Sequence, residues 1–360
     1  MKYKWGDLIT LEYGKPVKDK DSKSGNIPVF GTNGQIGTSH LPPLCPHASF
    51  ILGRKGAYRG VHYSDGPFSV IDTAFYAKNI RTDILSLKWA YYKFLTYDIN
   101  RMDSGSAIPS TDRYEIYGIE VELPPIKYQQ KIVCLLEFLN KKIELNNRIN
   151  DNLEQQARAI YQQMFIDNPD SSWELGILSD IANITMGQSP NSNSYNEEGN
   201  GTIFFQGRAE FGFRFPSVRL FTTEPKRMAC ENDTLMSVRA PVGDLNVAHK
   251  DCCIGRGLAA IHSKNNHQSF VHYTMFSLKK QLNVFNGEGT VFGSINRNAL
   301  NEMPILIPSD EKLDKFDSIV APMDAAIRNN YDEICRLEQL RDTLLPKLMS
   351  GELDVSDIDL

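Results

Sequence analysis

The stretch that decides the fold is residues 132–164, IVCLLEFLNKKIELNNRINDNLEQQARAIYQQM. Its apolar positions alternate in steps of four and three, which is the seven-residue repeat of a helix that supercoils against a partner helix. Residues 316–348 hold the same repeat, 184 positions further on. Each stretch ends one half of the chain, so the sequence predicts a duplicated, pseudo-two-fold molecule with two long helices in one register.

Two such helices in one chain can bury their apolar seams by lying antiparallel. Facing residues should then have numbers that sum to 480, so that Asn150 faces Asn330. A buried asparagine pair lowers stability but fixes the register, because a shifted register leaves amides unpaired. We expect Asn330→Leu to stabilise the helix pair and to loosen its alignment. The positions predicted to pair are Ile132, Leu136, Leu139, Ile143, Asn150, Leu153, Met323, Ile327, Asn330, Ile334, Leu337 and Leu344.

Two prolines interrupt the second helical pattern. Pro322 is expected to begin or kink this helix, and Pro346 to disturb its last turn. An isolated heptad segment would indicate only a coiled coil without further meaning. Here each segment follows a globular region of the same layout, which favours a functional duplication.

The globular regions, residues 1–125 and 168–308, share one order of short strand-like runs and glycine-rich turns. Ser49–Leu52 and Ala74–Ala77 are predicted strands, and Leu85–Tyr97 is a predicted helix. Segments of the first region match segments of the second, for example Leu52-Gly53-Arg54 with Ser237-Val238-Arg239. The predicted fold class is α+β, with two similar strand-rich globular domains separated by two long antiparallel coiled-coil helices.

Composition and charge exclude several classes of protein. The chain has 360 residues, 41% of them hydrophobic and 23% charged, as in globular proteins. It has no apolar run long enough for a membrane span and no signal-peptide pattern, so we expect no membrane association and a cytoplasmic location. The six cysteines form no C-x-x-C pair, which favours reduced, structural thiols.

The net charge of −5 is unevenly distributed. Residues 310–360 hold 6 Lys+Arg and 13 Asp+Glu, so the acid excess lies in the C-terminal helix and tail. The globular regions are neutral or slightly basic. DNA contact is therefore not excluded, although unaided affinity should be modest.

Catalytic and metal-binding motifs are missing from the sequence. The glycine cluster Gly31–Gly37 lacks the lysine of a phosphate-binding loop, and no Asn-Pro-Pro-aromatic run of an amino-methyltransferase occurs. His262, His267 and His272 lie five residues apart, which does not place them on one helical face as a zinc site requires. We predict no catalytic residue, no metal site and no bound cofactor.

A set of short motifs occurs twice, in the same order. They are Trp5-Gly6-Asp7-Leu8 with Gly14-Lys15-Pro16, Leu178-Ser179-Asp180-Ile181 with Gly187-Gln188-Ser189-Pro190, Gly105-Ser106, Gly289-Thr290-Val291, Leu123-Pro124-Pro125, Ile307-Pro308 and Gln129-Gln130-Lys131-Ile132. With the C-terminal run from Leu344 to Leu353, they make the chain resemble, over nearly its whole length, the specificity subunit of type I restriction-modification systems. Ser309-Asp310-Glu311-Lys312 departs from the family's usual Pro and Gln before the helix, so the entry to the second helix should differ.

The resemblance implies a division into four parts. These are a first target-recognition domain (1–125), a central spacer helix (126–167), a second target-recognition domain (168–308) and a C-terminal long helix with an acidic tail (309–360). Each domain would read one half of a bipartite site on double-stranded DNA, and the helices would set the spacer. Two modification (methyltransferase) subunits would carry S-adenosylmethionine and catalysis, and restriction (translocase/nuclease) subunits would complete the complex.

Base and phosphate contacts favour Arg, Lys, Asn and Gln on loops, with hydroxyls and backbone amides beside glycine. The predicted DNA-binding residues are Asn33, Gln35, Arg54, Lys55, Tyr58, Arg59, Ser106 and Arg113 in the first half, and Gln188, Asn191, Gln206, Arg208, Arg214, Arg239, Thr290 and Arg297 in the second. Two other interpretations stay open: a stand-alone DNA methyltransferase or nuclease with a divergent site, and a duplicated adaptor that binds proteins.

Overall fold

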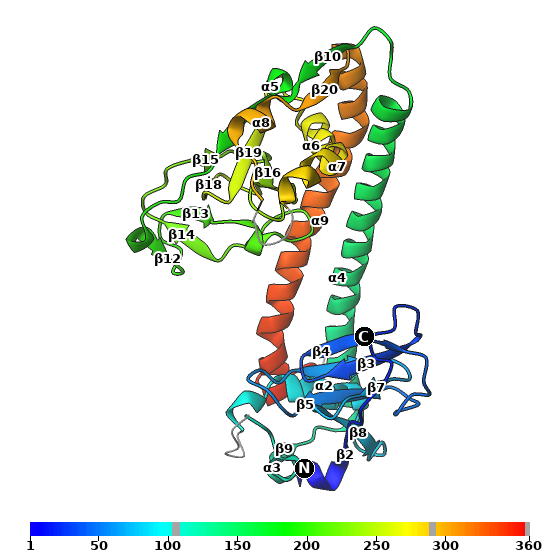
Figure 1. The fold of residues 1–360 in the computed structure, drawn as a ribbon. Coiled ribbons are helices and arrows are strands. Elements are labelled where there is room, and N and C mark those ends of the chain that lie inside the picture. Colours follow the sequence, from blue (N-terminus) through cyan, green and yellow to red (C-terminus); the bar gives the residue numbers. More distant parts are fainter. Residues whose placement is uncertain (103–108, 288–292, 357–360) are drawn as a thin grey trace. The chain divides into compact units, whose positions relative to one another are not determined.

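The computed structural model describes residues 1–102, 109–287 and 293–356. The chain divides into two compact units, one formed by Met1–Asn146 with Asp332–Leu360 and the other by Asn147–Tyr331. Each unit contains a strand-rich globular region and segments of two long helices (Figure 1). This mixture of helices and strands, present twice, is the predicted α+β class.

The first unit has two main sheets. Its strands are β1 (Lys2–Lys4), β2 (Ile9–Tyr13), β3 (Ile27–Gly31), β4 (Gly34–Ser39), β5 (Ser49–Gly53), β6 (Val61–Ser64), β7 (Ser69–Val70), β8 (Ala74–Ile80) and β9 (Glu120–Glu122), and its short helices are α1 (Trp5–Leu8), α2 (Leu87–Leu95) and α3 (Arg113–Gly118). An antiparallel sheet has the order β2-β8-β5-β6, and a second sheet has the order β4-β3-β7, in which β3 and β7 are parallel. Strand β1 pairs antiparallel with β9.

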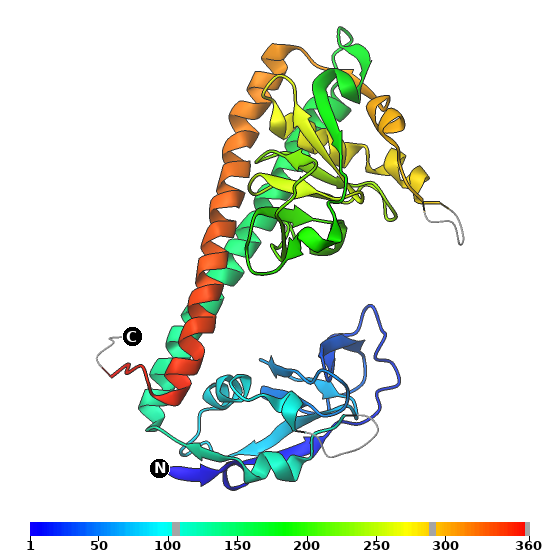
Figure 2. The same cartoon turned by 90° about the vertical axis from the view of Figure 1, so that its left-hand side faces the viewer.

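The second unit repeats this topology and has two further strands in its second sheet. Its strands are β10 (Glu174–Ile177), β11 (Ala182–Met186), β12 (Tyr195–Asn196), β13 (Thr202–Phe205), β14 (Leu220–Thr222), β15 (Met228–Ala229), β16 (Thr234–Ser237), β17 (Leu245–Val247), β18 (Cys252–Ile254), β19 (Leu258–Ser263) and β20 (Pro304–Ile307), and its short helices are α5 (Leu178–Ile181), α6 (Gln268–Ser277), α7 (Lys279–Leu282) and α8 (Arg297–Asn301). The order β11-β19-β16-β17 matches β2-β8-β5-β6, the parallel pair β13·β18 matches β3·β7, and β10·β20 matches β1·β9. Figure 2 shows the strands of each unit from a second side.

Hydrogen bonds fix the correspondence between the two regions at single-residue level. Lys55 forms a β-bridge with Ser110, and Arg239 forms one with Ser294. Both members of the second bridge lie 184 positions after those of the first. Lys55 therefore corresponds to Arg239, and the alignment of Arg54 with Arg239 expected from the sequence is wrong by one residue.

The repeated motifs have local structural causes. Asp7 accepts a hydrogen bond from the backbone N–H of Lys4 (3.0 Å) and so caps the turn of α1, and Asp180 does the same for Ile177 (2.8 Å) in α5. A Cβ at Gly14 would come within 2.0 Å of the carbonyl oxygen of Ile71, so only glycine fits this close approach. Gly187 is confined in the same way, at the equivalent position of the second region.

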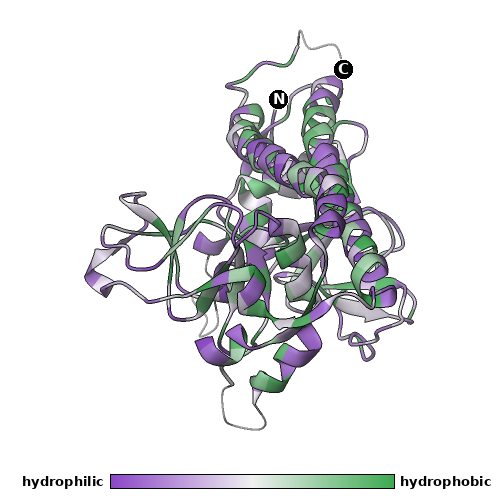
Figure 3. Cartoon of the chain, turned by 90° about the horizontal axis from the view of Figure 1, so that it is seen from above, coloured by the Kyte–Doolittle hydropathy of each residue, from purple (hydrophilic) through white to green (hydrophobic). Residues whose placement is uncertain are grey.

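The two long helices are α4 (Ile126–Tyr161) and α9 (Asp310–Ser350), and a π-helical turn, Gln162–Asp167, follows α4. Hydrophilic and hydrophobic residues are mixed along both helices (Figure 3). Helix α9 starts at Asp310, so the expectation that Pro322 begins it is wrong, and the helix continues past Pro346 to Ser350. Neighbouring packing sustains the helix despite the lost backbone hydrogen bonds.

The entries to the two helices differ in side chains but not in backbone. The N–H groups of Gln129 and Leu313 donate to the carbonyl oxygens of Pro125 and Ser309, four residues earlier in each case. In α4 the buried Gln129 side chain also accepts from the N–H of Ser86 (2.8 Å). Leucine stands at the same position in α9, so this additional connection is absent there.

Within the first unit, the seams of α4 and α9 share one apolar cluster. Ile132 and Leu136 of α4 belong to the cluster that contains Leu348 and contacts Leu344. Further along, the buried Asn146 donates to Glu333 (2.7 Å). The helices run antiparallel in this unit, because the partners of higher-numbered α4 residues have lower numbers in α9.

Within the second unit, the same register continues. Asn330 donates to Asn150 (2.8 Å), which is the pair that the sum of 480 predicts. Leu153 packs beside Ile327, and the cluster around Phe316 includes residues from the C-terminal end of α4.

Features relevant to other classes of protein can be stated for the described residues. None of the described helices combines the length and apolarity that a membrane crossing requires. No group of three or more potential metal-binding side chains occurs in the described ranges. All six cysteines are free thiols.

Candidate nucleic-acid interface

In the first unit, three segments meet beside the end of β5. The N–H of Gly60 donates to Thr32, in the turn after β3 (2.9 Å), and the N–H of Thr111 donates to Arg54 (2.9 Å). The loop after β5 is thereby held between the turn after β3 and the segment that leads into α3. Loops positioned by a rigid sheet in this way commonly carry binding residues.

Most first-half candidates lie in these three segments. Asn33, Gln35 and Tyr58 are exposed, whereas Arg54, Lys55 and Arg113 are half-buried. Lys55 forms an ion pair with Asp72 (3.6 Å). An exposed pair of this kind contributes little to stability, so Lys55 can exchange this partner for a phosphate.

Arg59 does not fit its predicted role. It is 2% exposed, and its guanidinium donates to the carbonyl oxygen of Asn100 (2.6 Å). The Asn100 side chain also accepts from the N–H of Arg59 (2.7 Å). Arg59 therefore holds the loop after β5 against the 3₁₀ turn at Ile99–Arg101, and we correct its assignment to a structural role.

In the second unit, most candidates are exposed around the corresponding segments. These are Gln188, Asn191, Gln206, Arg208, Arg239 and Arg297. Asn191 donates to Glu224 (3.2 Å), and Arg208 forms an ion pair with Asp244 (2.5 Å). DNA would have to replace these two carboxylates as the partners of Asn191 and Arg208.

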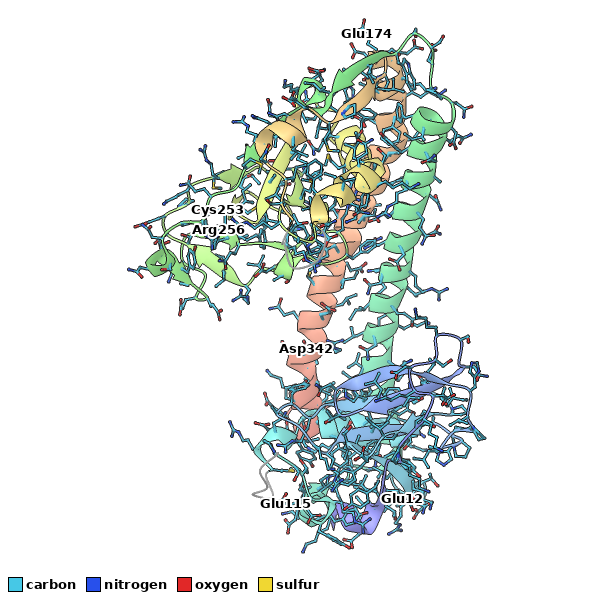
Figure 4. All side chains as sticks on the ribbon, in the orientation of Figure 1. Glu12, Glu115, Glu174, Cys253, Arg256 and Asp342 are labelled. Atoms are coloured by element: carbon cyan, nitrogen blue, oxygen red, sulfur yellow. The ribbon has the colours of Figure 1, made fainter. Side chains whose placement is uncertain are left out.

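Arg256 was missed by the sequence reasoning. It is exposed in the loop between β18 and β19, close to Cys253 (Figure 4). The backbone N–H of Arg256 donates to the hydroxyl of Ser189 (3.3 Å), the residue that follows the candidate Gln188 in the sequence. The corresponding residue of the first region is Asp72, of opposite charge, so a comparison of the halves could not have suggested it.

Arg214 is a second correction. It is 5% exposed and forms an ion pair with Asp324 of α9, and its guanidinium also lies 3.6 Å from Glu154 of α4. His272 accepts a hydrogen bond from Arg214 (2.6 Å), and burial with the adjacent positive charge lowers the pKa of His272 well below its ordinary value. Arg214 attaches its loop to the helices and is almost fully buried, which favours a structural role over a DNA contact.

Ser106 and Thr290 lie outside the described residues. The segments that follow them contain Ser110 and Ser294, which form β-bridges with the candidates Lys55 and Arg239.

Two tyrosines, Tyr13 and Tyr114, join the first-half candidates because arginine guanidinium groups lie over their rings. The guanidinium of Arg54 lies 4.6 Å from the centre of the Tyr13 ring, and that of Arg113 lies 5.1 Å from it. Arg113 also lies over Tyr114 (5.1 Å). Neither tyrosine was predicted, because Tyr13 ends β2 and Tyr114 lies in the first turn of α3, and only the folded chain brings both beside the arginines.

Comparison with known proteins agrees with the duplicated geometry. The family model for the type I restriction modification DNA specificity domain matches residues 1–155 and 170–339. The chain belongs to this family, and the model matches it twice.

Individual relatives are similar over much of the chain. The MjaX type I restriction enzyme specificity subunit of Methanocaldococcus jannaschii is 30% identical over 264 residues, which cover 68% of this chain and 62% of the relative. The chain thus spans less than two thirds of that relative's length. The MjaIX specificity subunit of the same organism is 26% identical over 310 residues, covering 75% of this chain and 70% of the relative.

One solved structure shows the same fold. The S subunit of a type I restriction-modification system from M. genitalium has a TM-score of 0.65 at 18% identity, with 99% of this chain and 96% of that chain covered.

Proposed function

We propose that this chain is the DNA sequence-specificity subunit of a type I restriction-modification complex. The observation that carries the proposal is that the strand order β2-β8-β5-β6 recurs as β11-β19-β16-β17, with exposed or half-buried Asn, Gln, Arg or Lys side chains around the loops of each unit. Such side chains read base edges in the major groove and contact phosphates. Each globular domain would read one half of a bipartite target on double-stranded DNA.

The long helices would set the spacing of the two half-sites. Helices α4 and α9 are each unbroken, and the hydrogen bond between Asn330 and Asn150 fixes their register in the second unit. Half-sites read by duplicated domains are typically separated by about one turn of DNA, ~34 Å. The four-part division into domains 1–125 and 168–308 and helical parts 126–167 and 309–360 belongs to this proposal.

The chemistry of the complex would belong to its partners. Two modification subunits would dock on exposed flanks of the helices and bind S-adenosylmethionine, and restriction subunits would add translocation and cleavage. This chain would bind no cofactor and carry no catalytic residue. Because its substrate is cellular DNA, we place it in the cytoplasm.

Mapping of methylated bases in cells with and without this gene tests the proposal. We expect one bipartite motif to lose methylation when the gene is deleted and to regain it on complementation. Methyl transfer by the purified chain alone would instead identify an enzyme. An assembled complex that binds all duplexes equally would identify an adaptor.

Single substitutions in corresponding turns sharpen this test. Asn33 lies after β3 and Gln206 after β13, and both are exposed. Asn33→Ala and Gln206→Ala should each relax base preference in one half of the motif only, by about 1–3 kcal/mol per lost base contact. Each variant serves as the control for the other.

A further inference from the structure

An arginine–tyrosine cluster on the first unit consists of Tyr13, Arg54, Arg113 and Tyr114. It joins the end of β2, the loop after β5 and the first turn of α3. Glu12 on β2 and Glu115 on α3 identify two of these elements in Figure 4. Tyr13 is anchored by the ring of Phe75, with ring centres 5.0 Å apart, yet remains 39% exposed.

The cluster brings two positive charges together without neutralising them. In the described parts of the chain, neither Arg54 nor Arg113 forms an ion pair with a carboxylate. Arg54 donates to the carbonyl oxygen of Asp72 (3.3 Å), while the Asp72 carboxylate pairs with Lys55 (3.6 Å). Two guanidinium groups on one ring repel each other, so their placement favours an anion between or above them.

The hydrogen-bonding groups of the cluster are almost all donors. Arg113 donates to the hydroxyl of Tyr114 (3.3 Å), which leaves that hydroxyl's own proton free to donate outward. Phosphate oxygens only accept hydrogen bonds, whereas every base pair presents a donor as well as acceptors in the major groove. A surface of donors therefore suits the DNA backbone better than a base pair.

We propose that this cluster binds the sugar–phosphate backbone beside the first half-site, and that Tyr13 is the positioning residue that holds both guanidinium groups ready for it. This inference rests on the proposed function. Stacking on the ring restricts the two long side chains before DNA arrives, so less conformational entropy is lost on binding.

The second unit lacks the corresponding cluster. Met186 ends β11 as Tyr13 ends β2, and the buried Val238 stands at the position of Arg54. Arg297 corresponds to Arg113 and is exposed, but Asn298 replaces the tyrosine beside it. The second region thus supplies matched control positions without the stacked pair.

The test measures binding of the assembled methyltransferase complex to a duplex with the mapped target and to one without it, over a range of salt. Arg113→Gln should reduce the slope of log affinity against log salt by about 0.9, the value for one phosphate contact. Tyr13→Leu should weaken binding to both duplexes about tenfold, with a shallower salt dependence, while Tyr13→Phe should bind as the parent does. Met186→Leu, the matched control, should leave the slope unchanged.

Two results would overturn the inference. One is unchanged affinity and salt slope in both Tyr13→Leu and Arg113→Gln. The other is altered preference for one base pair of the first half-site, which would show base readout. If the parent complex lacks base preference but the slopes still fall, the phosphate contact stands and the proposed function fails.

Discussion

The two globular regions share a backbone plan but are attached to the long helices by different side chains. In the first unit, Lys88 of α2 pairs with Glu137 of α4 (2.6 Å), and Tyr92 donates to the same carboxylate (2.5 Å). In the second unit, the residues 184 positions further on are His272, Ala321 and Phe276, which cannot form this contact. Arg214 reaches in from a loop and pairs with Asp324 instead.

This difference teaches which features the duplication retains. The order of the four-stranded sheet, the bridge of Lys55 or Arg239 and the confined glycine (Gly14 or Gly187) are the same in both regions, whereas the charged contacts to the helices differ. Side chains that attach a globular region to its helices, or that contact DNA, can therefore change in one region without affecting the other. Three substitutions test how independent the two attachments are.

The largest effect is expected from Arg214→Met. Arg214 is 5% exposed, and its removal leaves the half-buried Asp324 without its cation, while the buried Glu154 keeps only Arg158. Loss of one partner from a buried charged group typically costs about 3–5 kcal/mol. Hydrogen exchange should show the loss in the amides of β16 and α6, while those of β5 and α2 keep their protection.

Glu137→Gln is the matched change in the first unit. Lys88 and Glu137 are partly exposed, so we expect a smaller loss of about 1 kcal/mol, confined to the first unit. Equal losses in both units after either substitution would contradict independent attachment.

The second expected effect is a pH dependence that His272 adds to the second unit. Burial and the charges of Arg214 and Arg158 lower the pKa of His272 well below 6.5. The folded chain keeps this histidine neutral, while the unfolded chain takes up a proton as pH falls through 6.5. Stability is thus fully present above pH 6.5 and lost below it, by up to about 1.4 kcal/mol per pH unit.

His272→Gln isolates this contribution. Hydrogen exchange of the second unit between pH 7 and 5.5 should lose most of its pH dependence in the variant, because glutamine can still accept from Arg214. The first unit has Lys88 at the position that corresponds to His272, so its hydrogen exchange should depend on pH equally in the parent and in the variant. If the stability of the second unit depends on pH as strongly in the variant as in the parent, another group is responsible for that dependence.

The smallest effect concerns the asparagine pair. Asn150 is 3% exposed, so Asn330→Leu alone would leave a buried amide without its donor, and the stabilisation expected from sequence would be offset. Asn150→Leu with Asn330→Leu should stabilise the second unit by about 1 kcal/mol. Thermal unfolding measures the gain, and lower stability of the double variant would count against a register role.

The long helices could be predicted because their signal is periodic and repeated. Steps of four and three identify the seam without knowledge of its partner, and the 184-residue offset then aligns Asn150 with Asn330. Asp7 and Gly14 were recognisable as recurring motifs for a similar reason, since their roles depend on nearby backbone.

Residues whose roles depend on distant partners could not be assigned in this way. Arg214 resembles any loop arginine until Asp324, 110 positions later, is found beside it. Arg59 and Arg256 were misjudged for the same reason: burial and exposure depend on how loops meet. Tyr13 reveals its place only when Arg54 and Arg113, from other elements, lie on its ring.

The most direct measurement is methylation mapping after one heptad is inserted into each long helix, after Asn146 in α4 and after Tyr331 in α9. Seven residues add about 10.5 Å to a helix, close to three base pairs of DNA. The account predicts that both half-sites stay the same while the spacer between them lengthens by about three base pairs. An active complex that methylates the original spacer would contradict it.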